Sequence, residues 1–435
     1  MNLTDIKKVH LIGIGGIGVS AVAKFFLYQQ KEVTGSDVYP TALTKSLEKA
    51  GIKVFDGQRA ENLSADLDLI IYSPAVGENN PERQKAAELK IRQLSYPDFL
   101  GELSKDYQTI AVSGTNGKST TTAMIGKIFE AARLDPTVFV GTQVPGFDGN
   151  LRLGKSDLLI VEACEWKAHM LKLSPQVIVL TNLELDHTDY YKDIDDLKNQ
   201  FQKFIDGLPA GGLLAYNADD PNLNDLKKDK GYQVKSWSKN DQIDFQLTIP
   251  GDYNIANAQA AATVARHFNI PNQVIGKALA DFPNCWRRFE VLGPMKNQPE
   301  TLVVSDYAHH PTAIKGLLKA AREFYPGKRL VAVFQPHHYD RTAKLFDGFV
   351  KSFHDFDLLI INQIYDVAGR QKDGQRNISS EDLAREIKKR QPGKKIIYST
   401  NLRETKNLIL NNAQKGDLIL VIGAGDIDEV AREIV

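Results

Sequence analysis

A glycine-rich turn that carries a lysine offers the strongest chemical signal in the sequence. It reads Ser-Gly-Thr-Asn-Gly-Lys-Ser-Thr over residues 113–120, directly after the apolar run Thr109–Val112. The backbone amides of such a turn can wrap nucleotide phosphates, with Lys118 neutralising the terminal ones and Ser119 offering its hydroxyl to Mg²⁺. We therefore predict a nucleotide-phosphate site here, in preference to a turn that serves only the fold. Its predicted residues are Gly114, Thr115, Asn116, Gly117, Lys118, Ser119 and Thr120.

The spacing of this turn, G-x-x-G-K-S, is shorter than that of the usual phosphate loop. Val112 stands where the usual loop has its first glycine. This difference disfavours ordinary ATPases and GTPases and favours a narrower class of nucleotide-dependent enzyme.

A carboxylate that could share a cation with the turn is Glu162, at the end of a predicted strand. Mg²⁺ prefers oxygen ligands, commonly one or two carboxylates together with phosphates and water. Glu162 and the hydroxyl of Ser119 can both serve in this way. Lys118 and Glu162 are therefore predicted catalytic residues, and Glu162 and Ser119 are predicted metal ligands.

A second glycine turn near the N-terminus matches G-x-G-x-x-G over Gly13–Gly18, after the apolar run Val9–Ile12 and before an expected helix at Val19–Leu27. Such glycines let the backbone approach a pyrophosphate, whose charge is met by the helix N-terminus. Asp37 lies 19 residues after Gly18, where an acid could bind ribose hydroxyls. NAD, FAD and UDP-sugars all satisfy this pattern, and a purely structural turn is the alternative. The residues of this predicted site, for a UDP-sugar or another nucleotide diphosphate, are Gly13, Gly15, Gly16, Ile17, Gly18, Asp37 and Ser73.

These motifs must be positioned by parallel sheets. Apolar runs alternate with amphipathic helical stretches, and three of the runs, Val9–Ile12, Thr109–Val112 and Leu418–Ile422, lead into glycine turns. We predict an α/β protein of three domains, each a mainly parallel sheet with flanking helices. The domains are a Rossmann-like domain with the first glycine turn at 1–105, a central nucleotide- and Mg-binding domain with the phosphate loop at 106–286, and a Rossmann-like C-terminal domain at 287–435.

Further elements follow from the same periodicity. Helices are expected at Thr120–Phe129 and Asn254–Phe268, and a strand at Thr301–Ser305. Leu103–Tyr107 is a plausible first linker, and the second domain switch is placed near Cys285–Glu290.

The composition narrows the class of protein. The chain has 435 residues, 42% hydrophobic and 25% charged, which indicates a globular protein of more than one domain. Lys plus Arg equals Asp plus Glu, at 54 each, which disfavours a nucleic-acid partner bound through net charge. No apolar run approaches the ~18 residues of a membrane span, and no targeting signal opens the chain. Cys164 and Cys285 form no paired motif, so we expect a cytoplasmic protein without nucleic-acid or membrane partners.

Several motifs, in their order and spacing, resemble the Mur ligase superfamily, which includes the cell-wall amino-acid ligases and folylpolyglutamate synthase. The phosphate turn is one, and Glu162 at its strand end is another. The remaining motifs are Thr181–Asp189, which resembles N-x-x-x-D-H-x-D, Asn254–Ala258, which resembles N-x-x-N-A, and Arg287–Glu290, which reads R-R-F-E. The resemblance covers essentially the whole chain.

The C-terminal part narrows the resemblance. Asp306–Thr312, Phe334–His337 and Gly423–Asp426 look most like the members of the family that add L-alanine to UDP-N-acetylmuramate. The resemblance implies an ATP- and Mg²⁺-dependent ligase that works through an acyl phosphate in peptidoglycan precursor synthesis. Its substrates would be UDP-N-acetylmuramate and a free amino acid, L-alanine or a related one. We expect a monomer or a weak homodimer.

The resemblance also implies roles for single residues. It makes His187 a metal-binding and catalytic residue, although on chemistry alone a lone histidine is a poor Mg²⁺ ligand. It gives adenine recognition to Asn257 and a nucleotide contact to Arg288, and leaves Arg287 as an ordinary surface charge. Asn254 and Asn257 could otherwise be helix N-caps.

The amino-acid site is expected in the last domain. Tyr307, His309 and His337 resemble the family's amino-acid-pocket residues, and Arg341 is a suitable cation for the carboxylate of the incoming amino acid. The histidine pairs at 309–310 and 337–338 could suggest zinc, but no HExxH or comparable spacing accompanies them.

The sequence departs from the family pattern at a few positions. Cys164 stands in place of an acid, Trp166-Lys167 in place of a Ser-Asp pair, and His338 in place of an arginine. Gln58 replaces the histidine of a G-H-x-x-x-N element. Cys164 could be a reactive thiol or a small buried side chain, and the change at His338 leaves the preferred amino acid open.

Three rival functions remain. A sister ligase that reattaches a recycled tripeptide would need a pocket for a peptide amine. An NAD-dependent oxidoreductase would rest on the first glycine turn alone. A non-catalytic UDP-sugar-binding regulator would explain the changed positions, but not the intact Lys118, Ser119, Glu162 and His187.

Overall fold

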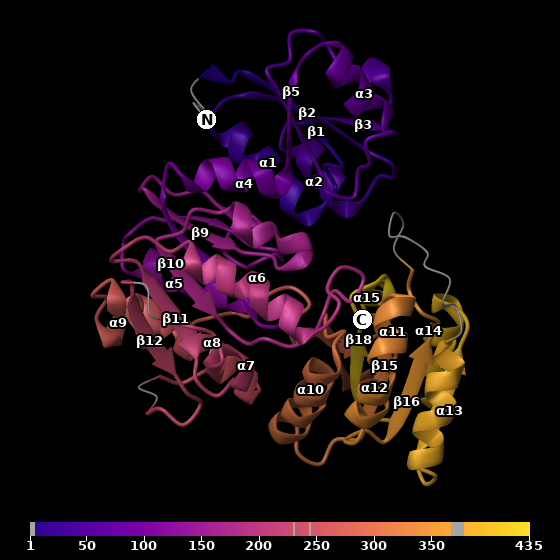
Figure 1. Cartoon of the computed structure of the whole chain (residues 1–435). Helices are drawn as coiled ribbons and strands as arrows, with labels where there is room; N and C mark the ends of the chain where they lie inside the picture. The colour runs from indigo at the N-terminus through magenta and orange to yellow at the C-terminus, as the bar shows by residue number, and fades with distance from the viewer. Residues whose placement is uncertain (1–4, 229–230, 243–244, 367–377) are drawn as a thin grey trace. The chain divides into compact units, whose positions relative to one another are not determined.

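The computed structural model describes residues 5–228, 231–242, 245–366 and 378–435. These residues form three separate β-sheets, each with flanking helices (Figure 1). Each sheet is mainly parallel, because helical crossovers connect most of its strands. The predicted α/β class with three domains is confirmed.

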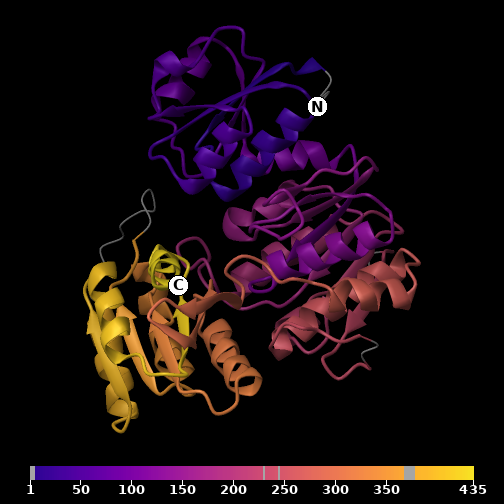
Figure 2. The same ribbon diagram turned by 180° about the vertical axis from the view of Figure 1, so that it is seen from behind.

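The first sheet has the strand order β3-β2-β1-β4-β5 and is parallel throughout. The order reverses beside β1, so the loops after β1 and β4 flank a switch point of the kind at which ligands bind in open α/β sheets. The strands are β1 (Lys8–Ile12), β2 (Glu32–Asp37), β3 (Lys53–Asp56), β4 (Leu69–Tyr72) and β5 (Arg92–Ser95). The helices are α1 (Ile17–Tyr28), α2 (Ala42–Lys49), η2 (Ala60–Asn62), α3 (Pro81–Glu88) and α4 (Tyr96–Ser104). Figure 2 shows this indigo-to-purple part from behind.

The second sheet has the order β12-β11-β10-β6-β9-β7-β8, and only the short β8 runs antiparallel to its neighbour. Its central strand β6 carries the phosphate turn at its carboxyl end and pairs with β9 and β10 on either side. The strands are β6 (Gln108–Ser113), β7 (Thr137–Phe139), β8 (Leu151–Arg152), β9 (Leu158–Glu162), β10 (Val177–Leu180), β11 (Leu213–Asn217) and β12 (Gln233–Trp237). The helices are α5 (Lys118–Ala131), η3 (Trp166–Lys172), α6 (Ile194–Asp206), α7 (Pro221–Asn224), α8 (Asp252–His267) and α9 (Asn272–Ala280).

The third sheet has the order β13-β14-β18-β15-β16-β17, with β13 antiparallel to β14 at one edge. The strands are β13 (Glu290–Met295), β14 (Gln298–Asp306), β15 (Leu330–Phe334), β16 (Leu358–Asn362), β17 (Lys395–Ser399) and β18 (Leu418–Ile422). The helices are α10 (Pro311–Phe324), α11 (Tyr339–Lys344), α12 (Phe346–Ser352), α13 (Ser380–Arg390), α14 (Leu402–Asn412) and α15 (Ile427–Ile434).

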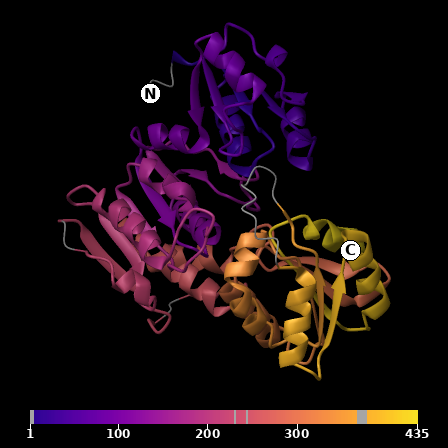
Figure 3. The same ribbon diagram turned by 45° about the vertical axis from the view of Figure 1, so that its right-hand side comes forward.

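Both faces of the third sheet are buried, as its β18 side chains demonstrate. Leu418, Leu420 and Ile422 lie in one apolar core, while Ile419 and Val421 lie in a second core on the opposite face. Figure 3 shows the orange-to-yellow strands with helices beside them. A strand that is apolar at every position is typical of a parallel sheet covered by helices on both faces.

The described chain divides into two compact units. One unit contains 1–183, 198–244 and 258–279, and the other contains 184–197, 245–257 and 280–435. The first two sheets thus share a unit, and three segments of the predicted central domain, 184–197, 245–257 and 280–286, belong to the unit of the third sheet. The boundaries at 105 and 286 stay predictions. Of the first predicted linker, Leu103 and Ser104 are helical residues of α4.

No helix among the described residues is both long and apolar enough to cross a bilayer.

Candidate functional site

The phosphate turn lies between β6 and α5, as predicted. Gly114 and Gly117 have positive φ, at 135° and 86°, so the turn uses conformations that a side chain would oppose. Helix α5 begins at Lys118, two residues before the predicted start, and its N-cap Gly117 has no side chain to cap it. The amides of this first turn are therefore the groups that an anion can use.

The turn is held in place by Asn182, which the sequence analysis did not assign. The Asn182 side chain accepts a hydrogen bond from the Asn116 amide at 2.9 Å and donates to the Asn116 carbonyl at 2.8 Å. Its backbone carbonyl accepts from the Thr115 amide at 3.1 Å. A Cβ at Gly114 would lie 2.1 Å from Thr181 Oγ1, so the turn and the residues after β10 are closely fitted.

Lys118 forms an ion pair with Glu165, which had no predicted role. Lys118 Nζ lies 2.9 Å from Glu165 Oε1, and it also donates to the carbonyls of Gly114 and Thr115. The Glu165 side chain is 1% exposed and that of Lys118 is 17% exposed. Burial alone would lower the pKa of Lys118, but the Glu165 carboxylate raises it above its usual value. Lys118 is therefore charged and directed at the turn.

Glu162 is the last residue of β9 and pairs in register with Val112 of β6. Its Oε1 accepts a hydrogen bond from the Gly141 amide. The carboxylate therefore lies at the same sheet edge as the turn that contains Ser119, and both residues offer the oxygen donors that Mg²⁺ prefers. The predicted residues of this unit fit a magnesium site, which needs no large cluster of protein ligands when phosphates complete it.

Cys164 is a poorly reactive thiol in this environment. Burial, followed by the Glu165 charge, raises the pKa of Cys164 to about 12. A thiol that stays protonated at neutral pH is a weak nucleophile, so the structure disfavours the reactive thiol, although Cys164 is only partly buried.

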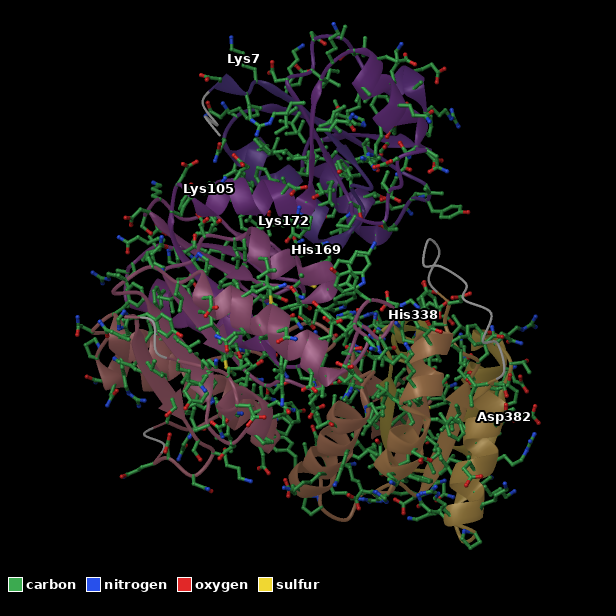
Figure 4. All side chains as sticks on the ribbon, viewed as in Figure 1. Lys7, Lys105, His169, Lys172, His338 and Asp382 are labelled. Atoms are coloured by element: carbon green, nitrogen blue, oxygen red, sulfur yellow. The ribbon has the colours of Figure 1, made fainter. Side chains whose placement is uncertain are left out.

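The changed Trp166-Lys167 positions lie in η3, which is bent. Lys167 and Ala168 both have positive φ, at 50° and 55°. Lys167 Nζ lies 4.7 Å above the Trp166 ring, and the Trp166 and His169 rings meet edge to face at 5.2 Å. His169 and Lys172 at the end of η3 are labelled in Figure 4, and Lys172 pairs with Asp98 of α4.

The N-terminal glycine turn lies at the switch point of the first sheet. Gly13 has a φ of 77°, and a Cβ there would lie 3.0 Å from Ser73 Cβ, so the predicted Ser73 and Gly13 are neighbours. The Gly15 amide donates to Asp37 Oδ2 at 2.7 Å, which places the predicted acid on the turn itself. Ile17 opens α1, whose N-cap Gly16 provides no side-chain cap. The structure thus brings the predicted UDP-sugar residues together.

Gly18 and Gln58 have identifiable neighbours. A Cβ at Gly18 would lie 2.6 Å from the Tyr96 ring, so the last glycine of the motif makes room for an aromatic side chain. Gln58 accepts a hydrogen bond from Asn80 Nδ2 at 2.7 Å, which joins its loop to the start of α3.

The four predicted amino-acid-binding residues lie together in the C-terminal unit. The rings of Tyr307 and His309 are 5.3 Å apart, and those of His309 and His337 are 6.2 Å apart. Arg341 Nη1 lies 3.2 Å from His337 Nδ1. Burial, and then the Arg341 charge, hold the pKa of His309 well below its usual value, so this imidazole is neutral.

Arg341 is also paired with Asp186, which the sequence analysis did not assign. Asp186 Oδ1 lies 2.9 Å from Arg341 Nε and 2.8 Å from Nη2, and both side chains are under 10% exposed. Burial alone would raise the pKa of Asp186, but Arg341 holds it well below the usual value. The Asp186 carboxylate therefore compensates the positive charge of Arg341 before any substrate binds.

His187 belongs to the C-terminal unit together with its segment 184–197. Two further contacts fix the segment there, from Lys344 Nζ to the Thr188 carbonyl at 2.5 Å and from His310 Nδ1 to Glu184 Oε2 at 3.1 Å. His187 itself has a φ of 50°, and its carbonyl accepts hydrogen bonds from the amides of Tyr190 and Tyr191. Its predicted metal role stays a prediction.

His338, which stands in place of the family's arginine, is buried. His338 is 7% exposed, has a φ of 70° and opens α11, and Figure 4 labels it there. Its ring meets that of His337 edge to face at 4.2 Å. In the part of the chain that the structure describes, no three or more His, Cys, Asp or Glu side chains are grouped to hold a metal ion.

Asn254 and Asn257 are not helix N-caps, because α8 begins at Asp252. Both are buried, and Asn254 Nδ2 donates to the Pro250 carbonyl at 2.7 Å. The N-cap alternative is wrong, and the adenine role of Asn257 stays a prediction.

The expectation of a surface charge at Arg287 is wrong. Arg287 is 6% exposed and donates to the carbonyls of Gly423 and Gly425, so it fixes the third glycine turn. Burial is possible because carbonyls and the nearby Asp428 compensate the guanidinium. Arg288 lies over the Tyr307 ring, 4.7 Å from its centroid, beside the predicted amino-acid residues.

Comparisons with known proteins agree with this architecture. Residues 8–108 match the Mur ligase family, catalytic domain, residues 112–243 match the Mur ligase middle domain, and residues 287–425 match the Mur ligase, glutamate ligase domain. The chain is 39% identical to a UDP-N-acetylmuramate–L-alanine ligase of Clostridium botulinum, over 98% of this chain and 97% of that one.

Solved structures are similar over the same length. A UDP-N-acetylmuramate–alanine ligase from Thermotoga maritima superposes with a TM-score of 0.83 at 26% identity, covering 98% of both chains. A murein peptide ligase from Psychrobacter arcticus has a TM-score of 0.71 at 22% identity, also over 98% of both chains, and at that identity it supports the fold alone. The three domain matches and the full-length relative together place this chain in the Mur ligase family.

Proposed function

We propose that the protein is a UDP-N-acetylmuramate–L-alanine ligase, which consumes ATP and forms an amide in peptidoglycan precursor synthesis. The observation that carries this proposal is the phosphate turn, in which the charged, partly buried Lys118 is paired with Glu165 at the sheet edge where Glu162 ends β9. The full-length similarity to the Clostridium botulinum ligase supports the choice of substrates.

The proposed reaction has two steps. The lactyl carboxylate of UDP-N-acetylmuramate attacks the γ-phosphorus of ATP, so that an acyl phosphate forms and ADP leaves. The neutral amine of L-alanine then attacks the acyl carbon, phosphate leaves, and the amine gives up a proton as the amide forms. Lys118 stabilises the charge on the phosphoryl oxygens in both steps.

Magnesium is part of the proposal. Glu162 and Ser119 would hold Mg²⁺, with His187 as a further ligand that the family resemblance predicts. Bound Mg²⁺ would neutralise phosphate charge. Glu165 contributes by orienting the Lys118 ammonium rather than by touching the substrate.

Substrate binding is assigned to the two remaining sites. The glycine turn at Gly13–Gly18 with Asp37 and Ser73 binds the UDP-sugar, because an uncapped helix N-terminus suits a diphosphate. Tyr307, His309, His337 and Arg341 bind the amino acid. We place the protein in the cytoplasm, where ATP and nucleotide sugars are available, and expect a monomer or weak homodimer.

An assay of phosphate release tests the proposal. UDP-N-acetylmuramate and ATP are supplied with L-alanine, glycine, L-serine or the recycled tripeptide in parallel reactions. Release that depends on L-alanine is expected. Preference for the tripeptide would select the recycling ligase, and UDP-sugar binding without turnover on any amine would select the non-catalytic regulator.

A further inference from the structure

Gly141, just after β7, lies directly against the predicted magnesium ligand Glu162. The Gly141 amide donates a hydrogen bond to Glu162 Oε1. A Cβ built on Gly141 would lie 2.9 Å from Oε2, 3.0 Å from Oε1 and 3.2 Å from Cδ of Glu162. Both carboxylate oxygens therefore occupy the space that any other residue at position 141 would need for its side chain.

The backbone does not explain this glycine. Gly141 has no positive φ, unlike Gly146 and Gly149 in the same loop, at 82° and 64°. An L-residue could adopt its conformation without strain. The feature that a side chain would disturb is therefore the Glu162 carboxylate.

The loop that carries the Gly141 amide is fixed at both ends. The Val140 amide donates to the Asn150 carbonyl at 3.0 Å, which closes the loop. Asn150 is 1% exposed, and its Nδ2 donates to Ser20 Oγ at 3.0 Å and to the Ile17 carbonyl, both in α1. Because the loop is held at both ends, the Gly141 N–H points in a fixed direction. A hydrogen-bond donor with a fixed direction can orient a metal ligand.

The loop has a second connection to α1. Lys24, only 5% exposed, donates from Nζ to the Asp148 carbonyl at 2.9 Å and to Asp148 Oδ1 at 3.1 Å. The loop is itself exposed at Gly141 and Asp148, but the buried side chains of Asn150 and Lys24 connect it to α1.

We infer that Gly141 is a positioning residue for the ligase reaction, because its amide aims one oxygen of Glu162 and its missing side chain leaves room for the carboxylate beside the phosphate turn. This inference rests on the proposed function, in which Glu162 holds Mg²⁺. Partners that orient a metal ligand commonly change metal affinity about 10- to 100-fold when they are altered.

The test is the variant Gly141→Ala, with Mn²⁺ binding to the ADP complex followed by electron paramagnetic resonance. We expect Mn²⁺ affinity to fall about 10- to 100-fold, while ADP affinity in EDTA and the thermal unfolding temperature in EDTA stay at wild-type values. Gly393→Ala is the matched control, since a Cβ there meets nothing within 4 Å. Unchanged Mn²⁺ affinity in Gly141→Ala would overturn the inference.

Glu162→Gln separates this inference from the proposed function. If Glu162→Gln weakens Mn²⁺ binding and Gly141→Ala does not, Gly141 has no positioning role and the ligase proposal stands. If Glu162→Gln leaves Mn²⁺ binding unchanged, the metal role of Glu162 in the proposed function fails.

A double variant covers the case in which Gly141→Ala alone does not fold. Asp at position 162 is one methylene shorter and withdraws its carboxylate from position 141. Gly141→Ala combined with Glu162→Asp should therefore fold and bind Mn²⁺ as Glu162→Asp does, because the two changes remove the same contact. A further tenfold loss in the double variant would contradict the positioning role.

Discussion

Asp186 and Arg341 form a buried ion pair in which a single carboxylate oxygen lies 2.9 Å from Nε and 2.8 Å from Nη2 of the guanidinium. The two residues are 155 positions apart in the chain, so the pair ties the segment 184–197 to α11. Arg341 was predicted as the cation for the amino acid's carboxylate. Its Nε and Nη2 are engaged by Asp186, and its Nη1 contacts His337 Nδ1 at 3.2 Å, so a substrate carboxylate would meet the guanidinium on its His337 side.

The ion pair should dominate the stability of this part of the C-terminal unit. Asp186→Ala leaves a buried guanidinium without its carboxylate, and the free energy of unfolding should fall by about 3–5 kcal/mol. Urea unfolding measures this loss. Asp252→Ala, which breaks the exposed pair with Lys319, is the control and should change little.

A double variant shows whether Asp186 and Arg341 stabilise the protein as a pair or independently of each other. The double variant Asp186→Ala with Arg341→Ala should lose clearly less than the sum of the single losses, since the second change removes the uncompensated charge. Strict additivity would mean that the two side chains do not stabilise each other.

Lys118 should be the residue most needed for turnover. Lys118→Ala removes the ammonium aimed at the phosphates, and we expect kcat to fall by about 100- to 1,000-fold, the usual cost of one stabilising donor. Lys105→Ala is a matched control, because Lys105 forms an exposed pair with Glu102. Full activity in Lys118→Ala would contradict the assignment of the phosphate turn.

Glu165 should act through Lys118. In Glu165→Gln the ammonium loses its charged partner, so the pKa of Lys118 falls and the alkaline limb of the kcat profile should move to lower pH. A purely structural role for Glu165 would reduce stability and leave the position of that limb unchanged.

Much of the fold follows from local patterns in the sequence. The apolar run Leu418–Ile422 coincides with β18, and the run Thr109–Val112 lies inside β6. The phosphate turn and the first glycine turn were located because glycine spacing dictates local backbone geometry. Local periodicity is enough for such elements, because each is formed by residues close in the chain.

Long-range partners could not be found in this way. Glu165 reaches Lys118 across 47 positions, and Arg287 reaches Gly423 across 136. Spacing carries no signal for such pairs, because they form only when the sheets assemble. Arg287 was expected at the surface for the same reason, since nothing near it in sequence supplies the carbonyls that compensate its charge.

The N-terminal sheet should lose stability in acid through Glu82. Burial alone would raise the pKa of this carboxyl, but the nearby His10 and the hydrogen bonds that Ser36 and Asn62 donate lower it below the usual value. A depressed pKa in the folded state stabilises the protein above the unfolded pKa of about 4.3. This contribution is therefore lost as the pH falls below about 5 towards the lowered pKa.

Glu82→Gln tests the sign of this effect. The variant cannot take up the proton, so its free energy of unfolding should depend less steeply on pH between about 5 and 3 than that of the wild type. Urea unfolding at a series of pH values measures the two slopes. Equal slopes would mean that Glu82 titrates alike in the folded and unfolded protein.

Cys164 should resist alkylation although Lys118, the proposed catalytic lysine, is close enough to influence the pKa of its thiol. Burial, followed by the charge of Glu165, raises its pKa to about 12, so at pH 8 its thiolate fraction is about three orders of magnitude below that of a thiol with the ordinary pKa of about 8.5. Iodoacetamide labelling of a Cys285→Ala variant isolates Cys164 and should be slow in the folded protein. In urea the same thiol should react at the ordinary rate. Rapid labelling of the folded variant would show that burial and the Glu165 charge do not keep this thiol protonated.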